Sequence, residues 1–235
     1  MTATELHFIT VAEAARRIAR RELSPLELTE AYLQRIGAFD DQLQSFVTLT
    51  ADLARRQAKA AEAEIMRDGP RSPLHGVPYC LKDIVETAGI RTTGQSKLLA
   101  DHIPVEDAAV AAKLRDAGGI LLGKTATWEF AHGGPSWDVQ FPPARNPWNT
   151  DHHPAGSSSG SGAAIAAGFA PATIGSDTGA SIRGPAAACG SSGRIRISAC
   201  SRPRTLSASA TRPASIMAPS RSTKARWTAG TSSRP

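Results

Sequence analysis

Between residues 76 and 184 the chain alternates short apolar segments with helix-forming ones, and this alternation restricts the possible folds most strongly. The segments with strand or helix character, in chain order, are 76–82, 107–117, 119–122, 163–170 and 172–175. Two loops rich in glycine and serine lie before and after the last two of these segments, at 156–162 and 176–184. Strands that alternate with helices favour an α/β sandwich, in which loops at the edge of the sheet carry the chemistry.

Three helices are expected before this region, at 11–19, from residue 25 onward and at 51–66. Thr10 is placed to cap the first. Ser24 and Pro25, with Glu27 three residues after the serine, form the pattern of a capping box with proline at the first helical position. The second helix should bury one apolar face, made by Leu28, Tyr32, Leu33 and Ile36.

The composition is that of one sizeable domain. The chain has 235 residues, of which 41% are hydrophobic. No apolar run approaches the roughly 18 residues that span a bilayer, and the first residues lack the pattern of a secretory signal. The three cysteines, Cys80, Cys189 and Cys200, have no metal-ligand spacing. We therefore expect a reduced, cytoplasmic protein with no cofactor, metal or membrane partner.

The net charge of +6 comes from the end of the chain. Residues 191–235 contain nine Lys or Arg and no Asp or Glu, which leaves 18 basic against 21 acidic residues in 1–190. The body is therefore mildly acidic, and we expect no direct nucleic-acid partner. The weakest alternative is nucleic-acid binding through the tail, with a steep dependence on salt.

The tail also differs in composition. Residues 191–235 hold 11 Ser, eight Arg and four Pro without helical or strand periodicity, which predicts a disordered segment. A frameshift is the other explanation. Residues 191–193 can be encoded by codons whose neighbouring reading frame gives Val-Val-Gly. Residues 214–220 can likewise be encoded by codons whose neighbouring reading frame gives Leu-Asp-His-Gly-Pro-Ile. We divide the chain into a domain at 1–190 and a tail at 191–235.

Two serine loops and one lysine are the candidates for chemistry. A serine hydroxyl needs a positioned base to become a nucleophile. Lys82 ends the apolar segment 76–82. Burial without a fixed anion lowers the pKa of a lysine, and the neutral amine can then act as a base. Small-residue loops such as 154–162 and 175–185 can also direct backbone N–H groups at an oxyanion. Alone, the first loop could be a linker and Lys82 an exposed loop residue.

Together these segments resemble the amidase-signature family, which includes amidases and glutamyl-tRNA(Gln) amidotransferase A subunits. The similar segments are GVPYCLKDI, LLGKTATWEFA, RNPWNTDHHPAGSSSGSGAA and GSDTGASIRGPAAACG, in colinear order from about Val11 to Gly190. The resemblance implies an α/β/α sandwich with a mixed sheet. Family members are roughly twice as long, so the C-terminal half of that fold is expected to be missing.

The resemblance also implies a catalytic set. Lys82 takes the position of the family's base, Ser157 that of its bridging serine in a cis peptide, and Ser181 that of its nucleophile. The implied oxyanion hole consists of the N–H groups of Thr178, Gly179, Ala180 and Ser181. Asp177 and Arg183 match residues that brace the loop. Ala180 replaces the usual glycine, which costs on the order of 1 kcal/mol if its φ is positive.

The implied activity is hydrolysis of a carboxamide in a small molecule through an acyl-enzyme, without histidine. His152 and His153 are then surface residues, and Trp128, Trp137 and Trp148 are packing residues. Two alternatives remain open, an inactive truncated remnant and the glutamine-hydrolysing A subunit of a tRNA-dependent amidotransferase. The corresponding partners are a second copy in a homodimer or the other amidotransferase subunits.

Overall fold

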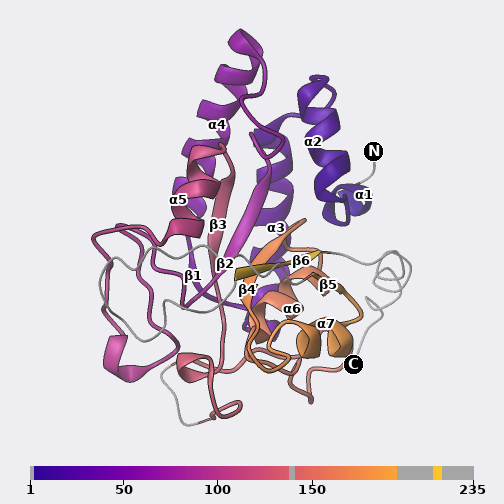
Figure 1. The fold of residues 1–235 in the computed structure, drawn as a ribbon. Helices are drawn as coiled ribbons and strands as arrows, with labels where there is room; N and C mark the ends of the chain where they lie inside the picture. Colours follow the sequence, from indigo (N-terminus) through magenta and orange to yellow (C-terminus); the bar gives the residue numbers. More distant parts are fainter. Residues whose placement is uncertain (1–2, 138–140, 195–213, 219–235) are drawn as a thin grey trace.

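The computed structural model describes residues 3–137, 141–194 and 214–218 (Figure 1). Within these ranges the helices are α1 (Ala3–His7), α2 (Val11–Ala19), α3 (Pro25–Leu43), α4 (Ala51–Asp68), α5 (Ala109–Asp116), α6 (Ser159–Ala166) and α7 (Arg183–Cys189). The strands are β1 (Phe46–Leu49), β2 (Pro78–Lys82), β3 (Ile120–Thr125), β4 (Thr173–Ser176), β5 (Ser192–Arg194) and β6 (Ala214–Ala218). Two short 3₁₀ turns, η1 (Lys97–Leu99) and η2 (Glu129–Ala131), lie in loops.

The described strands form one mixed sheet in the order β1-β3-β2-β4-β6-β5. Strand β2 is parallel to both β3 and β4, while β1, β5 and β6 join by antiparallel pairing. The expected α/β class with a mixed sheet is therefore confirmed. The parallel centre brings the last residues of β2, β3 and β4 together, because parallel strands end at the same edge of a sheet.

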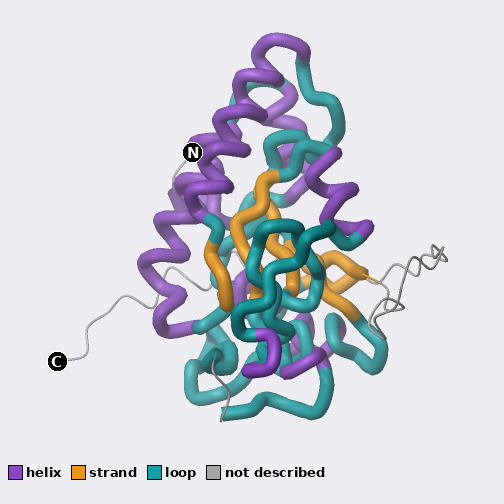
Figure 2. The backbone as a smooth tube through the Cα atoms, turned by 90° about the vertical axis from the view of Figure 1, so that its left-hand side faces the viewer, coloured by secondary structure: helices purple, strands orange, loops and turns teal. Residues whose placement is uncertain are grey.

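Helices cover both faces of the central strands, and Figure 2 shows the strands between them. On one face, Cys80, Ile120 and Leu122 pack into a core with residues of α2, α3, α4 and α6. On the other face, Tyr79, Leu81 and Leu121 pack with Ala111 of α5. Because successive residues of a strand point to opposite faces, the almost continuous apolar runs of β2 and β3 supply both cores.

The predicted helix starts in the N-terminal region are confirmed. The side chain of Thr10 accepts a hydrogen bond from the Glu13 amide, and that of Ser24 accepts one from the Glu27 amide. The predicted apolar face of α3 is also buried. Helix α6 begins at Ser159, inside the segment expected to be a loop, and α1, α7 and β1 were not predicted from the sequence.

Two short pieces of the basic tail are strands. Ser192–Arg194 forms β5, and Ala214–Ala218 forms β6 between β5 and β4. These eight residues are ordered, contrary to the expected disorder, because β6 pairs through its backbone with β4 and β5 with β6, and such pairing does not require an apolar side-chain pattern. Residues 195–213 and 219–235 lie outside the described residues, so the division of the chain at Gly190 stays a prediction.

No helix in the described part of the chain is long and apolar enough to cross a membrane.

Gly123 lies in β3 opposite Leu49 of β1. A Cβ at this position would lie 2.5 Å from the Thr48 carbonyl oxygen and 3.2 Å from the Leu49 Cα. We expect Gly123→Ala to lower the free energy of unfolding by about 1–3 kcal/mol, because backbone atoms must move to admit the methyl group. Urea unfolding measures this change. Gly134→Ala is the control, since nothing lies within 4 Å of its added Cβ, and equal unfolding midpoints for the two variants would contradict the prediction.

Candidate active site

The last residues of three parallel strands meet at one edge of the sheet. They are Lys82 of β2, Thr125 of β3 and Ser176 of β4. Lys82 is paired with Thr125 in the β2–β3 register, and all three side chains are buried. In α/β folds this edge is where ligands and reacting groups are usually placed.

Lys82 contacts a hydroxyl group from each of the two Ser-rich loops. Its Nζ donates a hydrogen bond to Ser157 Oγ at 2.7 Å and another to Ser176 Oγ at 3.0 Å. Lys82 and Ser157 both have 0% exposure, although 75 residues separate them in the chain. The fold thus brings together two of the three residues expected to be catalytic.

The Gly/Ser loop reaches Lys82 because it is held closely on several sides. The Gly156–Ser157 peptide bond is cis, as the resemblance implied. Gly160, in the first turn of α6, donates its N–H to the Ala126 carbonyl, and an added Cβ there would lie 2.3 Å from the Ser45 carbonyl oxygen. Glycine is therefore required where the helix approaches this backbone.

Ser181, the third expected catalytic residue, lies beside the Gly/Ser loop. Its carbonyl oxygen accepts a hydrogen bond from the Ser158 amide at 3.1 Å, and its side chain is partly exposed. Ser158 makes a second connection, since its Oγ donates to the Ser176 carbonyl at 3.3 Å. Ser158 therefore links the first serine loop to two points of the second, Ser176 and Ser181.

Asp177 holds the loop that contains Ser181. Its carboxylate accepts hydrogen bonds from the amides of Ala180, Ile182 and Arg183 and pairs with the Arg183 guanidinium at 3.0 Å. The Arg183 hydrogen bonds, followed by the backbone N–H groups, lower the pKa of Asp177 well below its usual range. These are the contacts expected of two residues that brace this loop.

Ala180 has a φ of +81°, in the left-handed region that favours glycine. Its N–H donates to Asp177 Oδ1 at 3.0 Å, so a substrate oxygen would have to compete with a carboxylate for it. Of the four residues expected to form an oxyanion hole, Ala180 is therefore the poorest donor in this arrangement. Thr178, Gly179 and Ser181 remain the candidates.

Two buried polar residues near the strand ends, Ser176 and Lys124, were not predicted from the sequence. Ser176 directly precedes Asp177, and its position at the end of an apolar strand was the available signal. Lys124 of β3 is fully buried on the other face, where Nζ donates to the carbonyl of Val85 and the hydroxyls of Thr87 and Thr92. Burial lowers the pKa of Lys124 to about 8.

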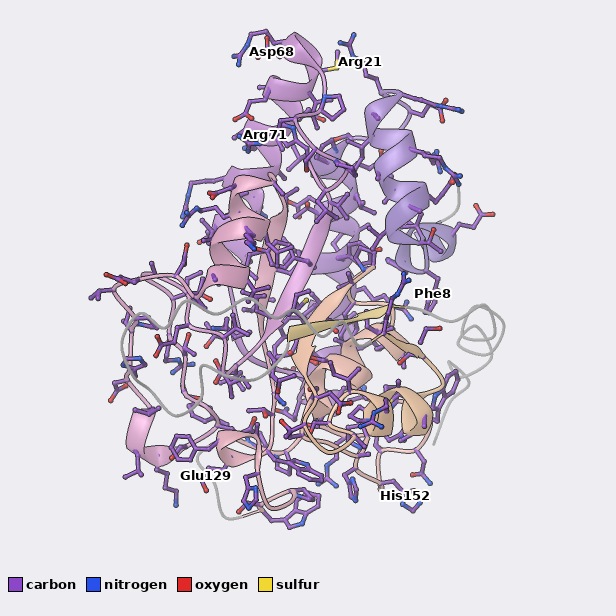
Figure 3. The ribbon with its side chains drawn as sticks, in the orientation of Figure 1. Phe8, Arg21, Asp68, Arg71, Glu129 and His152 are labelled. Atoms are coloured by element: carbon purple, nitrogen blue, oxygen red, sulfur yellow. The ribbon has the colours of Figure 1, made fainter. Side chains whose placement is uncertain are left out.

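Other polar candidates lie outside this cluster. His152 and His153 are exposed, as expected of surface residues. Figure 3 shows Glu129 and His152 at one end of the molecule and Asp68 and Arg21 at the other. Trp137 is also exposed and stacks with Arg145, whereas the indole of Trp148 donates to the Cys189 carbonyl. The described residues contain no cluster of three or more His, Cys, Asp or Glu that could hold a metal ion.

Comparison with known proteins gives the family that the sequence motifs resemble. The family model described as Amidase matches residues 27–194. A relative in Roseiflexus sp. (strain RS-1), which is named as the A subunit of glutamyl-tRNA(Gln) amidotransferase, is 48% identical over 190 residues. These residues cover 81% of this chain and 39% of the relative.

Solved structures agree. The chain is similar to "Fatty acid amide hydrolase" with a TM-score of 0.83 and 27% identity, covering 94% of this chain and 40% of the other. It is similar to the native peptide amidase from Stenotrophomonas maltophilia with a TM-score of 0.70 and 38% identity, covering 76% and 38%.

The fold and the Lys–Ser cluster therefore define an α/β scaffold of the amidase type. This chain belongs to the amidase family, and it spans about 40% of the length of the curated relatives it matches.

The depressed pKa of Asp177 makes its contribution to stability dependent on pH. A carboxyl whose pKa is lower in the folded chain stabilises the fold above its unfolded pKa of about 4, and this contribution is lost as the pH falls through the folded pKa. We expect Asp177→Asn to lower the free energy of unfolding at pH 7 by about 1–3 kcal/mol. The difference from the parent should shrink below pH 4. A difference that stays constant from pH 7 to pH 3 in denaturant titrations would contradict this.

The positive φ of Ala180 predicts a stabilising substitution. Ala180→Gly removes the Cβ from a left-handed position and should raise the free energy of unfolding by about 1 kcal/mol. Ala187→Gly, at an exposed position in α7, is the matched control and should lower it by about 0.5–1 kcal/mol. Thermal unfolding of both variants gives the comparison, and a loss of stability in both would show that Ala180 is not strained.

Proposed function

We propose that Lys82, Ser157 and Ser181 hydrolyse a carboxamide through an acyl-enzyme. The observation that carries this proposal is the 2.7 Å hydrogen bond between two fully buried side chains, Lys82 and Ser157. Burial disfavours the charged form of an amine, and a neutral amine can accept a proton from a hydroxyl group beside it.

In the proposed first step Ser181 Oγ attacks the carbonyl carbon of the amide. The proton of Ser181 passes to Ser157 Oγ, while the proton of Ser157 passes to Lys82 Nζ. The N–H groups of Thr178, Gly179 and Ser181 stabilise the negative oxygen of the tetrahedral intermediate. The proton returns through Ser157 to the leaving nitrogen as the C–N bond breaks. Water then cleaves the ester, and Ser181 recovers its proton.

A second candidate, the role of an amidotransferase A subunit, is favoured by the names of the curated relatives, which are 44–48% identical to this chain. It uses the same three residues with glutamine as the amide, and the ammonia then passes to partner subunits.

Covalent modification by an alkyl fluorophosphonate tests the proposal without requiring turnover. The intact chain should gain one adduct, at Ser181, and Ser181→Ala should gain none. Lys82→Met keeps the volume of the buried side chain and should slow modification by at least about a hundredfold, because the serine loses its base. Ser157→Ala should have a similar effect. Intact-mass spectrometry gives the rates, and peptide mapping gives the site.

Lys97→Ala is the matched control, since Lys97 is exposed in η1 and its loss should leave the rate unchanged. Equal rates for Lys82→Met and Lys97→Ala would refute the roles assigned here. If all variants keep a cooperative unfolding transition and the parent chain gains no adduct, the described residues do not activate Ser181 and the proposal fails.

A further inference from the structure

Trp128 contacts both residues of the Gly156–Ser157 peptide unit. Its backbone N–H donates a hydrogen bond to the Ser157 carbonyl at 3.1 Å. Its indole lies against Gly156, where an added Cβ would be 2.2 Å from Trp128 Cε2 and 2.4 Å from Nε1. Trp128 therefore holds Ser157 through a backbone hydrogen bond and Gly156 through contact with its flat, apolar ring.

The turn that carries Trp128 is itself attached to the loop that follows Lys82. The Thr127 N–H donates to Gln95 Oε1 at 2.8 Å, and the Phe130 N–H donates to the Gly94 carbonyl at 2.9 Å. The Gly94 N–H in turn donates to the carbonyl of Asp83, the neighbour of Lys82, at 2.8 Å.

Asp83 strengthens this attachment through its side chain. Its Oδ2 accepts hydrogen bonds from the Thr93 N–H at 3.0 Å and from the Thr93 hydroxyl at 2.5 Å. Both side chains have 0% exposure, so water does not compete for these bonds. Lys82 and Ser157 are thus connected twice, by their own hydrogen bond and by a path of hydrogen bonds through Asp83, Thr93–Gln95 and Thr127–Trp128.

We propose that Trp128 is a positioning residue that holds Ser157 Oγ at hydrogen-bonding distance from Lys82. It acts through Gly156 and Ser157 and takes no part in proton transfer. The indole nitrogen is buried and has no hydrogen-bond partner among the described residues. The flat ring is therefore the part of the side chain that supports the loop, and phenylalanine should replace it. The inference rests on the proposed function, because the position of Ser157 matters chemically only if Ser157 relays a proton.

Three variants separate the ring from the rest of the residue. Trp128→Ala removes the surface against Gly156, Trp128→Phe keeps it without the N–H, and Gly156→Ala forces the two apart. For fluorophosphonate modification of Ser181 we expect Trp128→Ala and Gly156→Ala to slow the rate by about tenfold or more, since small misplacements of reacting groups are costly. Trp128→Phe should stay within about twofold of the parent. The double variant with Trp128→Ala and Gly156→Ala should be modified no more slowly than Trp128→Ala alone, because the methyl group added at residue 156 then meets no ring.

The pH profile of the modification distinguishes positioning from general loosening. If Trp128→Ala separates Ser157 from Lys82, its profile should flatten toward that of Lys82→Met. A lower rate with the parent profile would mean a destabilised but correctly arranged site and would contradict the positioning role. A parent-like rate and profile in Trp128→Ala would overturn the inference, while modification that is equal in the parent and Lys82→Met would overturn the proposed function instead.

Hydrogen–deuterium exchange gives a result even if Ser181 is not modified. Peptides that cover 156–162 should exchange faster in Trp128→Ala and at the parent rate in Trp128→Phe, with no change in α4 of either variant. Unchanged exchange at 156–162 in Trp128→Ala would overturn the inference whatever the reactivity of Ser181.

Discussion

Burying the Nζ of Lys82 beside two hydroxyl groups is the requirement on which the rest of the structure depends. A lysine that is removed from water without partners is destabilising, so the fold must deliver oxygen atoms to it from distant parts of the chain. Ser157 and Ser176 do so at 2.7 and 3.0 Å. Ser176 arrives as the end of a neighbouring parallel strand, which regular sheet geometry provides. Ser157 arrives in a loop and needs dedicated supports.

The loop after Lys82, to which the turn with Trp128 is attached, is held by buried polar side chains, and this makes the site sensitive to sequence. Lys124, on the other face of the sheet, fixes the loop after Lys82 through Val85, Thr87 and Thr92. Burial raises the pKa of the Asp83 carboxyl on that loop, whereas the nearby Lys124 and the Thr93 hydrogen bonds lower it. A buried polar network of this kind specifies one arrangement when its members are satisfied, and it is costly to disturb in part.

Much of the fold followed from local patterns. The capped helices α2 and α3 and the apolar strands β2, β3 and β4 were visible because capping residues and continuous apolar runs are local signals. The edge strand β1 lacks such a run, and α6 starts among glycines and serines, where propensity favours a loop. Tertiary contacts determine the formation of β1 and the start of α6.

Only part of the candidate site could be predicted from the sequence. Lys82, Ser157 and Ser181 were found through motif resemblance, and local chemistry alone left Lys82 ambiguous. The contact of Ser176 with Lys82 depends on the pairing of β2 with β4, which spacing does not reveal. The occupation of the Ala180 N–H by Asp177 and the packing of Trp128 on Gly156 are properties of folded loops.

The wide separation of these partners along the chain has a consequence for synthesis on the ribosome. Ser157 is made 75 residues after Lys82, a delay of roughly 4 to 15 s at about 5–20 residues per second. Until β4 follows, one side of β2 is an unpaired edge in a nascent chain. Charged side chains that point inward are one means by which proteins discourage pairing of such edges with other chains. Lys82 stands at the end of this edge, so before it meets a serine it can protect the growing chain from aggregation.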